Sequence, residues 1–313
     1  MKELKPYRPW QLLLLTAAAL SLGGCENTIF NSKGLLGVQE AHLIVVAFVA
    51  MLIVVIPTIS LVVIFAVRYR SSNTSANYDP NWSKSNVIEV AIWAVPIAII
   101  SFLAVLAYKT SHDLDPYRPL DSNVKPLEVQ VVSLDWKWLF IYPEQGIATI
   151  NELYIPEKTP INFEVTSQTV MNTFFIPKLG GMIYAMAGQR TELHLLANEE
   201  GQFDGVSGNY SGVGYNAGMY FDVHSTTQQD FQSWVAKVQS SEQALDFAKY
   251  QELANHDHKL LAADPHYKIQ HTPAQSFTLS DPGLFRKVLG QFIDYNKSGQ
   301  TVSQTHATEG GED

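Results

Sequence analysis

LIVVAFVAMLIVVIPTISLVVIFAV, residues Leu43 to Val67, is the stretch that decides how this chain is built. It carries no charged residue, and at about 1.5 Å per helical residue it exceeds the roughly 30 Å hydrocarbon core of a bilayer. A second uncharged stretch, VAIWAVPIAIISFLAVLAY, runs from Val90 to Tyr108. A long helix that is apolar on every side is typical of a membrane span. We therefore expect a hairpin of two transmembrane α-helices.

The loop between the two stretches predicts their orientation. It contains Arg68, Arg70 and Lys84 against the single acid Asp79. Short loops rich in lysine and arginine remain in the cytoplasm. The chain before the first span, and everything after Lys109, are then expected on the outer side of the membrane.

The N-terminus predicts an exported lipoprotein. MKELKPYRPWQLLLLTAAALSLGGC begins with basic residues, continues with a short apolar core and ends in small residues before Cys25. This is the layout of a signal peptide, and its end resembles a bacterial lipobox. We expect residues 1–24 to be removed and Cys25 to carry a covalent lipid. Residues 25–109 would then form the acylated N-terminus and the transmembrane hairpin.

The composition excludes several classes of protein. The 313 residues are 46% hydrophobic and 16% charged, with a net charge of -9. Soluble domains carry about 25% charged residues, so the deficit agrees with membrane spans. An acidic chain lacks the basic surface of a nucleic-acid binder. The single cysteine excludes an internal disulfide and any intrachain metal site built on two thiolates.

Residues 123–235 change to a strand-like pattern. Short alternating or aromatic-rich runs are separated by turn residues, which predicts an all-β sandwich or barrel. The turns are expected at Pro143–Gly146, Pro156–Pro160, Leu179–Gly181 and Glu200–Gly205. The expected strands are Leu127–Ser133, Trp138–Tyr142, Ile161–Thr166, Glu192–Ala197 and Met219–His224.

Two helical stripes follow the strands. We expect residues 236–295 to form a C-terminal helical extension, and the polar residues 296–313 to be a disordered tail. The apolar positions that recur at helical spacing are Phe231, Trp234, Val235 and Val238, and then Leu284, Phe285, Val288, Leu289, Phe292 and Ile293.

In four stretches the sequence resembles subunit II of the haem–copper respiratory oxidases, and it is most similar to the bo-type ubiquinol oxidase branch. The resemblance implies that the outer domain is a cupredoxin-like Greek-key sandwich on the periplasmic side of a bacterial inner membrane. The stretches are SNVIEVAIWAVPI (Ser85–Ile97), VVSLDWKWLFIYPEQGIATINEL (Val131–Leu153), VMNTFFIPKLGGMIYAMAGQ (Val170–Gln189) and DGVSGNYSGVGYNAGMYF (Asp204–Phe221).

The copper-binding branch of this family carries a dinuclear copper centre on the last two stretches. Its pattern is a histidine shortly before a proline, followed by C-x-x-x-C-x-x-x-H-x-x-M. Soft thiolates, imidazoles and a thioether suit copper. In this sequence no thiolate and no imidazole stands at a ligand position, so we expect no metal in this chain and hydrogen-bonded packing instead. The corresponding residues are Asn172, Ser207, Ser211, Tyr215 and Gly218, with Met219 one position after the methionine site.

The resemblance therefore implies a subunit without a redox group of its own. Its only attached group would be the lipid on Cys25, while haem and copper would lie in the partner subunit I. The electron donor would be membrane-dissolved ubiquinol rather than cytochrome c. The expected partners are subunit I, smaller membrane subunits and membrane lipid.

Three residues remain as candidates for function. Glu89 lies at the cytoplasmic mouth of the second span, where an ionisable residue is a functional candidate. The resemblance places it at the entrance of a proton-uptake path, and the alternative is an ordinary interfacial acid, solvated or paired with Lys84. Trp136 and Trp138, at i and i+2 of an expected strand, are predicted to serve packing and the interface with subunit I.

Three other functions stay open on the sequence alone. One is the copper-bearing subunit of a cytochrome c oxidase, which the residues at the ligand positions disfavour. Another is a stand-alone membrane-anchored cupredoxin-like lipoprotein that acts as a scaffold or binding module. A menaquinol-using aa-type oxidase is the third.

Overall fold

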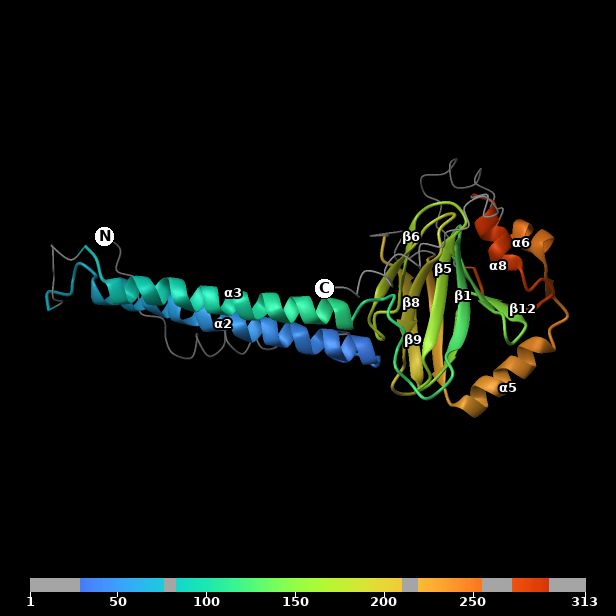
Figure 1. Ribbon diagram of the computed structural model, residues 1–313, viewed down its shortest axis with the longest axis horizontal. Coiled ribbons are helices and arrows are strands. Elements are labelled where there is room, and N and C mark those ends of the chain that lie inside the picture. The colour runs from blue at the N-terminus through green and yellow to red at the C-terminus, as the bar shows by residue number, and fades with distance from the viewer. Residues whose placement is uncertain (1–28, 76–82, 210–218, 255–271, 293–313) are drawn as a thin grey trace, which may run out of the picture.

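Two long helices project from one end of a two-layered β-domain (Figure 1). The computed structural model describes residues 29–75, 83–209, 219–254 and 272–292. The predicted signal peptide (1–24), Cys25 and the whole predicted tail (296–313) therefore lie outside the described residues.

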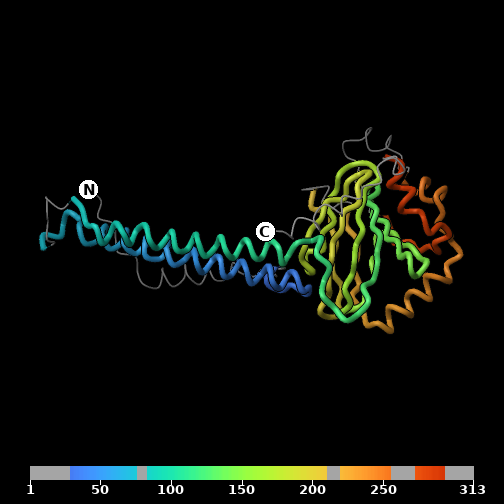
Figure 2. The backbone as a smooth tube through the Cα atoms, viewed as in Figure 1, coloured from blue at the N-terminus to red at the C-terminus, as the bar shows by residue number. Residues whose placement is uncertain are grey.

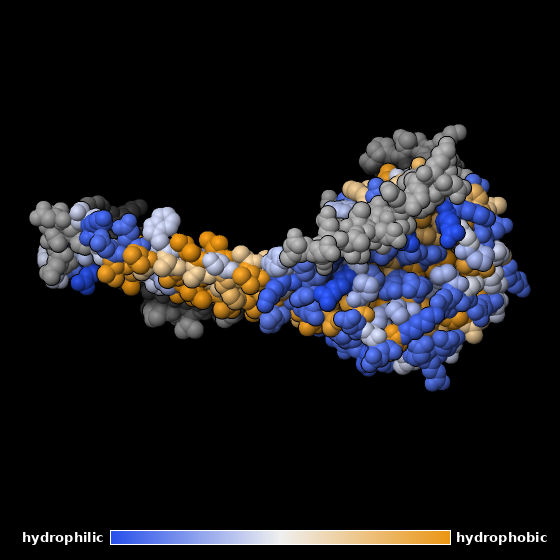
Figure 3. Space-filling model, viewed as in Figure 1, coloured by the Kyte–Doolittle hydropathy of each residue, from blue (hydrophilic) through white to orange (hydrophobic). Residues whose placement is uncertain are grey.

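The hairpin is formed by α2 (Leu35–Arg68) and α3 (Asn86–Asp113), which confirms the two predicted spans and extends both. Each helix continues through its internal proline. Both are long and apolar enough to cross a membrane, and almost none of their residues is buried in this chain. Figure 3 shows the resulting apolar surface along the hairpin. A water-soluble helix of this length would bury its apolar side chains, so these helices require lipid or protein around them.

The β-domain consists of two packed sheets (Figure 2). One sheet has seven strands in the order β11-β12-β3-β2-β1-β5-β8, and the other has five in the order β4-β10-β9-β6-β7. The strands are β1 (Leu127–Leu134), β2 (Lys137–Tyr142), β3 (Ile147–Ile150), β4 (Glu152–Pro156), β5 (Ile161–Ser167), β6 (Asn172–Phe175), β7 (Met182–Ala185), β8 (Thr191–Leu195), β9 (Gly201–Ser207), β10 (Tyr220–Thr226), β11 (Ala244–Leu245) and β12 (Gln275–Leu279).

The register of β1 explains how one strand serves two cores. It pairs in antiparallel fashion with β2 and in parallel with β5, with Val129 opposite Phe163. Successive side chains of a strand point to opposite faces. Val129 and Val131 therefore enter the core between the sheets, whereas Val132 and Leu134 belong to a second core on the outer face.

The C-terminal region packs on the second core, and it is not only helical as predicted. Besides α5 (Gln228–Gln239), α6 (Phe247–Ala254) and α8 (Leu284–Gly290), this region contributes β11 and β12 to the seven-stranded sheet. The expected boundary at residue 235 falls inside α5. The first helical stripe is confirmed, because Phe231, Trp234, Val235 and Val238 of α5 are buried. The second is confirmed for Leu284, Phe285, Val288 and Leu289 of α8. It is wrong for Phe292, which lies after α8 and is exposed, and Ile293 lies outside the described residues.

The turn expected at Glu200–Gly205 is wrong, because β9 occupies this stretch. Its glycine has a packing role instead. A Cβ atom on Gly205 would overlap the ring of Phe221 on β10, which pairs with it in register. Glycine in a strand marks such a close approach as readily as it marks a turn.

The hairpin is joined to the sandwich through the start of α2. The backbone N–H groups of Lys33 and Gly34 donate to the carbonyl of Lys178 at 2.7 and 3.1 Å, and that of Gly37 donates to Leu179 at 3.2 Å. Gly180, at φ +81°, would place a Cβ atom 2.5 Å from the backbone nitrogen of Gly37. The contact is therefore backbone against backbone and has no room for side chains.

Candidate functional site

The positions that correspond to copper ligands lie at one end of the sandwich. Asn172 begins β6 and Ser207 ends β9, which pairs with β6, while Met219 immediately precedes β10. All three residues are buried. The fold thus brings together the two sequence stretches that carry these positions.

A hydrogen-bond network occupies this place. The amide of Asn172 donates through Nδ2 to Oγ of Ser133 at 2.6 Å, and Oγ of Ser207 donates to Oδ1 of Asn172 at 3.3 Å. The backbone N–H of Ser207 donates to the carbonyl of Met219 at 2.9 Å. Buried polar atoms need such partners, and here they satisfy one another. Ser133 was not predicted, because only the strand pairing of β1 brings it to Asn172.

Aromatic rings support the network from the core side. Trp138 contacts Phe174 and Phe221 edge-on, each at 5.6 Å between ring centroids, and these two phenylalanines stack at 5.4 Å. The indole Nε1 of Trp138 donates to the carbonyl of Met219 at 3.4 Å. Edge-to-face and offset-stacked pairs add to the area they bury. The aromatic core is thereby joined to the network through the Met219 carbonyl, which accepts from both Trp138 and Ser207.

The donor atoms present do not fit a dinuclear copper centre. Hydroxyl and amide groups are hard, neutral ligands, whereas copper electron-transfer sites are built from thiolate and imidazole. Within the described ranges, no group of three or more histidine, cysteine, aspartate or glutamate residues could hold a metal ion. Ser211, Tyr215 and Gly218 lie outside the described residues.

The two tryptophans have different surroundings. Trp138 lies on β2 with no exposed surface, so the predicted interface role is wrong for it and packing remains. Trp136 lies in the turn between β1 and β2 at φ 59°, so the two residues do not share a strand face. Its side chain is half-buried against the main core. At Lys137, the first residue of β2, burial lowers the pKa, and the nearby carboxylate of Asp135 opposes that shift.

Glu89 occupies the first turn of α3, at the end of the hairpin far from the sandwich (Figure 1). Its side chain is exposed in this chain. Among the described residues, no ion pair joins it to Lys84. A carboxylate at the helix N-terminus is favoured by the helix dipole.

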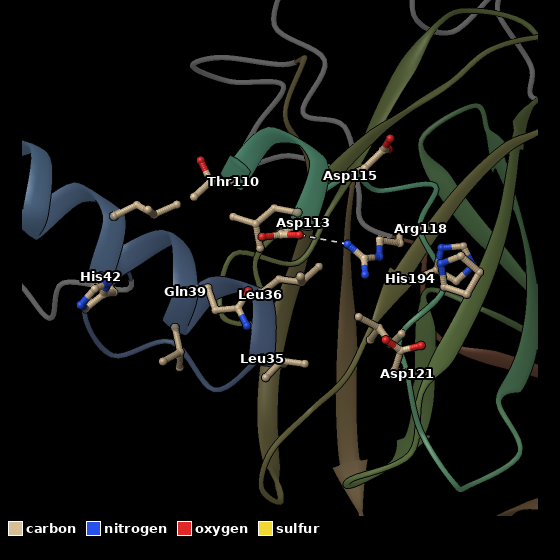
Figure 4. A pocket seen from close by; sticks show the side chains of 15 residues that line it. Leu35, Leu36, Gln39, His42, Thr110, Asp113, Asp115, Arg118, Asp121 and His194 are labelled. Carbon is tan, nitrogen blue, oxygen red and sulfur yellow. Dashed lines mark hydrogen bonds and ion pairs between the residues drawn. The ribbon is translucent and has the colours of Figure 1, made fainter. Parts of the chain in front are cut away.

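A cavity of about 720 Å³, which was not predicted, lies between the hairpin and the sandwich. This open cavity is lined by the first turns of α2, the end of α3, the following segment and β8 (Figure 4). Nδ1 of His194 on β8 hydrogen-bonds the carbonyl of Pro116 at 2.8 Å, so it carries the proton in this contact. Arg118 pairs with Asp113 at 3.0 Å.

Comparison with known proteins finds similar chains that are named subunit 2 of quinol oxidases. The chain is 48% identical over 307 residues to cytochrome bo(3) ubiquinol oxidase subunit 2 of Pseudomonas aeruginosa, covering 98% of this chain and 88% of that protein. It is 51% identical over 278 residues to ubiquinol oxidase subunit 2 of Acetobacter aceti, covering 88% and 86%. The chain belongs to the ubiquinol oxidase subunit 2 family. A quinol oxidase subunit 2 of Bacillus cereus is 35% identical over 249 residues, covering 78% of this chain and 85% of that one.

Among solved structures, the periplasmic domain of subunit II of cytochrome oxidase from Bradyrhizobium japonicum matches with a TM-score of 0.35 and 22% identity. It covers 38% of this chain and 96% of that domain. No protein-family model matches the chain.

Membership in the subunit 2 family indicates that this chain works as part of a complex. Subunit II of such an oxidoreductase complex works with a subunit I, and the catalytic centres lie in another subunit. Two apolar helices followed by a sandwich fit a two-pass membrane protein with a periplasmic domain.

Proposed function

We propose that this chain is the subunit II of a proton-pumping terminal oxidase that takes electrons from ubiquinol and reduces oxygen to water in subunit I. The observation that carries the proposal is the hydrogen-bonded pair of Asn172 and Ser207, which occupies the place of copper ligands. The names of the relatives, ubiquinol oxidase subunit 2, support the choice of donor.

Loss of the copper centre has a direct consequence for the electron path. Cytochrome c delivers electrons from outside the membrane and needs a redox group in the outer domain to receive them. A quinol dissolves in the bilayer and can reduce a haem in subunit I without passing through this chain. The sandwich would then serve assembly and stability, with no redox group and no role for cytochrome c.

The anchoring of the subunit follows from the ends of the hairpin. The loop with Arg68, Arg70 and Lys84 lies at the end of the hairpin far from the sandwich, which supports a cytoplasmic loop and a periplasmic domain in a bacterial inner membrane (Figure 1). The lipid on Cys25 would add an anchor to the two spans. The mature N-terminus then lies on the same side as the sandwich.

Glu89 is the residue of this chain that would take part in proton uptake. Its position at the far end of α3 is on the side where the proposed topology places the cytoplasm. An exposed carboxylate there can gather protons and pass them to subunit I. Trp136, half-buried in the turn between β1 and β2, would contact subunit I.

The test is purification of the complex through a tag on this chain in mild detergent. We expect haem bands at stoichiometric level in the reduced-minus-oxidised spectrum. We also expect oxygen consumption with a ubiquinol analogue and none with reduced cytochrome c. A folded, haem-free preparation would instead identify a stand-alone lipoprotein scaffold, and rapid cytochrome c oxidation would identify a copper-type oxidase.

A further inference from the structure

The cavity between hairpin and sandwich lies where membrane and water meet. Its wall on the α2 side extends from Leu35 to Leu43, and Leu43 is the first residue of the uncharged span. On α3 it is lined by Thr110 and Asp113, directly after Lys109 ends the second apolar stretch. One end of the cavity therefore opens at the hydrocarbon boundary, and the other lies against the sandwich at the depth of lipid headgroups.

The two sides of the lining differ in chemistry. The α2 side is mostly apolar, with Leu35, Leu36, Val38 and Leu43 beside the polar Gln39 and His42. On the end of α3 and the segment after it, the lining contains Arg118 and three carboxylates. Figure 4 shows Arg118 between Asp113 and Asp121, with the carboxylate of Asp115 pointing away. The carboxylates belong to Asp113, Asp115 and Asp121.

The segment that carries the polar side of the lining is held in place by a hydrogen bond. The hydrogen bond between His194 and the Pro116 carbonyl holds the segment after α3 against β8. Arg118 donates to Asp113 through one nitrogen, Nη1, at 3.0 Å. A guanidinium has five N–H donors arranged as a fork, so this contact leaves donors directed elsewhere for an anionic oxygen.

The geometry points to a binding site for one zwitterionic aminophospholipid from the leaflet beside the sandwich. Arg118 would bind the phosphate, the aspartates would bind the primary ammonium, and an acyl chain would lie along Val38 and Leu43. With three carboxylates and one guanidinium, the lining is acidic and disfavours a lipid whose headgroup carries only negative charge. A volume of about 720 Å³ is within the usual range of roughly 300–1,000 Å³ for small-molecule sites.

This site would join the hairpin to the sandwich independently of the electron donor. A lipid held between α2 and the segment 113–121 would contact both parts of the subunit. Its binding is therefore measurable even in a preparation that oxidises no quinol. Failure of the lipid assignment and failure of the proposed function can be distinguished in one sample.

The test is native mass spectrometry of the assembled oxidase, purified in detergent and then offered phosphatidylethanolamine or phosphatidylglycerol. We expect one tightly retained phosphatidylethanolamine that Arg118→Gln lowers at least tenfold. The matched control is Arg286→Gln, an exposed arginine on α8 on the far side of the sandwich, which should retain the lipid as the unchanged protein does. Equal retention in both variants would overturn the proposal.

Two further measurements test the ammonium site and the source of the ligand. Asp121→Lys should keep a lipid but shift the preference towards phosphatidylglycerol, because the ammonium site gains a positive charge. An unchanged preference would contradict the assignment of the acidic side. Soluble phosphoethanolamine should fail to displace the lipid, and displacement by this headgroup alone would contradict the bilayer as the source of the ligand. Haem content and subunit ratio show whether each variant has assembled.

Discussion

Gly180→Ala should loosen the junction between the first span and the sandwich. Gly180 has a φ of +81°, a conformation that glycine adopts readily and other residues do not. A methyl group there would lie 2.5 Å from the nitrogen and 2.6 Å from the Cα of Gly37. Both are backbone atoms of α2, so no side-chain rotation can relieve the overlap.

The cost has two parts. Left-handed backbone costs a non-glycine residue roughly 1–2 kcal/mol. Withdrawal of α2 to ordinary contact at 3.4 Å requires a shift of about 0.9 Å. Such a shift breaks the 3.2 Å hydrogen bond from Gly37 to Leu179 and weakens those to Lys178, at about 0.5–1.5 kcal/mol each. The sum is about 2–4 kcal/mol.

Gly146→Ala is the matched control. Gly146 also has a positive φ, +66°, but a methyl group there meets nothing within 4 Å. It should cost only the conformational part, about 1–2 kcal/mol. In thermal unfolding of the purified complex, Gly180→Ala should lower the Tm of the periplasmic domain by about 5–15 °C, and Gly146→Ala by roughly half as much.

Hydrogen exchange separates the two parts directly. The amides of Lys33, Gly34 and Gly37 donate to the sandwich and should exchange faster in Gly180→Ala but not in Gly146→Ala. Equal melting temperatures and equal exchange rates in the two variants would refute the backbone-to-backbone junction.

Three more predictions concern single side chains. Glu89→Gln should slow turnover of the assembled oxidase and leave its haem content intact; unchanged turnover at limiting proton supply would remove the proton-uptake role. Asn172→Ala leaves Ser133 and its neighbours without their buried partner and should cost about 1–3 kcal/mol in denaturant unfolding, with no effect on haem. Burial raises the pKa of Tyr142, so the folded chain keeps a phenol proton that the unfolded chain loses above pH 10; stability is full below pH 10 and falls as pH rises beyond it. Tyr142→Phe should flatten this alkaline loss in thermal unfolding against pH, while losing the two hydrogen bonds with Tyr154 at neutral pH.

Much of the architecture could be read from local patterns. Uncharged runs of membrane length predict spans whatever sequence surrounds them, because lipid favours apolar side chains on every side of the helix. Alternation predicted β5, β8 and the first half of β1, where buried and partly exposed side chains alternate; the second half of β1 is buried on both faces. The loss of the copper ligands can be recognised from the sequence, because the residue types at the ligand positions determine whether copper can bind.

What the sequence did not predict depends on contacts between distant segments. Gly201 and Gly205 predict a turn where the structure has β9, and only the contact with the Phe221 ring explains Gly205. β12 joins the sheet by pairing with β3 across more than a hundred residues, which no local period encodes. The same holds for the hydrogen bond of Ser133 to Asn172 and for the cavity between hairpin and sandwich.

The absence of a redox centre from this subunit is tested by the copper content of the assembled oxidase, measured by elemental mass spectrometry against its haem. We expect copper only for the haem–copper centre of subunit I, one atom per complex. We also expect Ser207→Ala to leave this ratio unchanged, since Ser207 donates a hydrogen bond to Asn172. Additional copper that Ser207→Ala removes would contradict the claim that this subunit carries no redox centre.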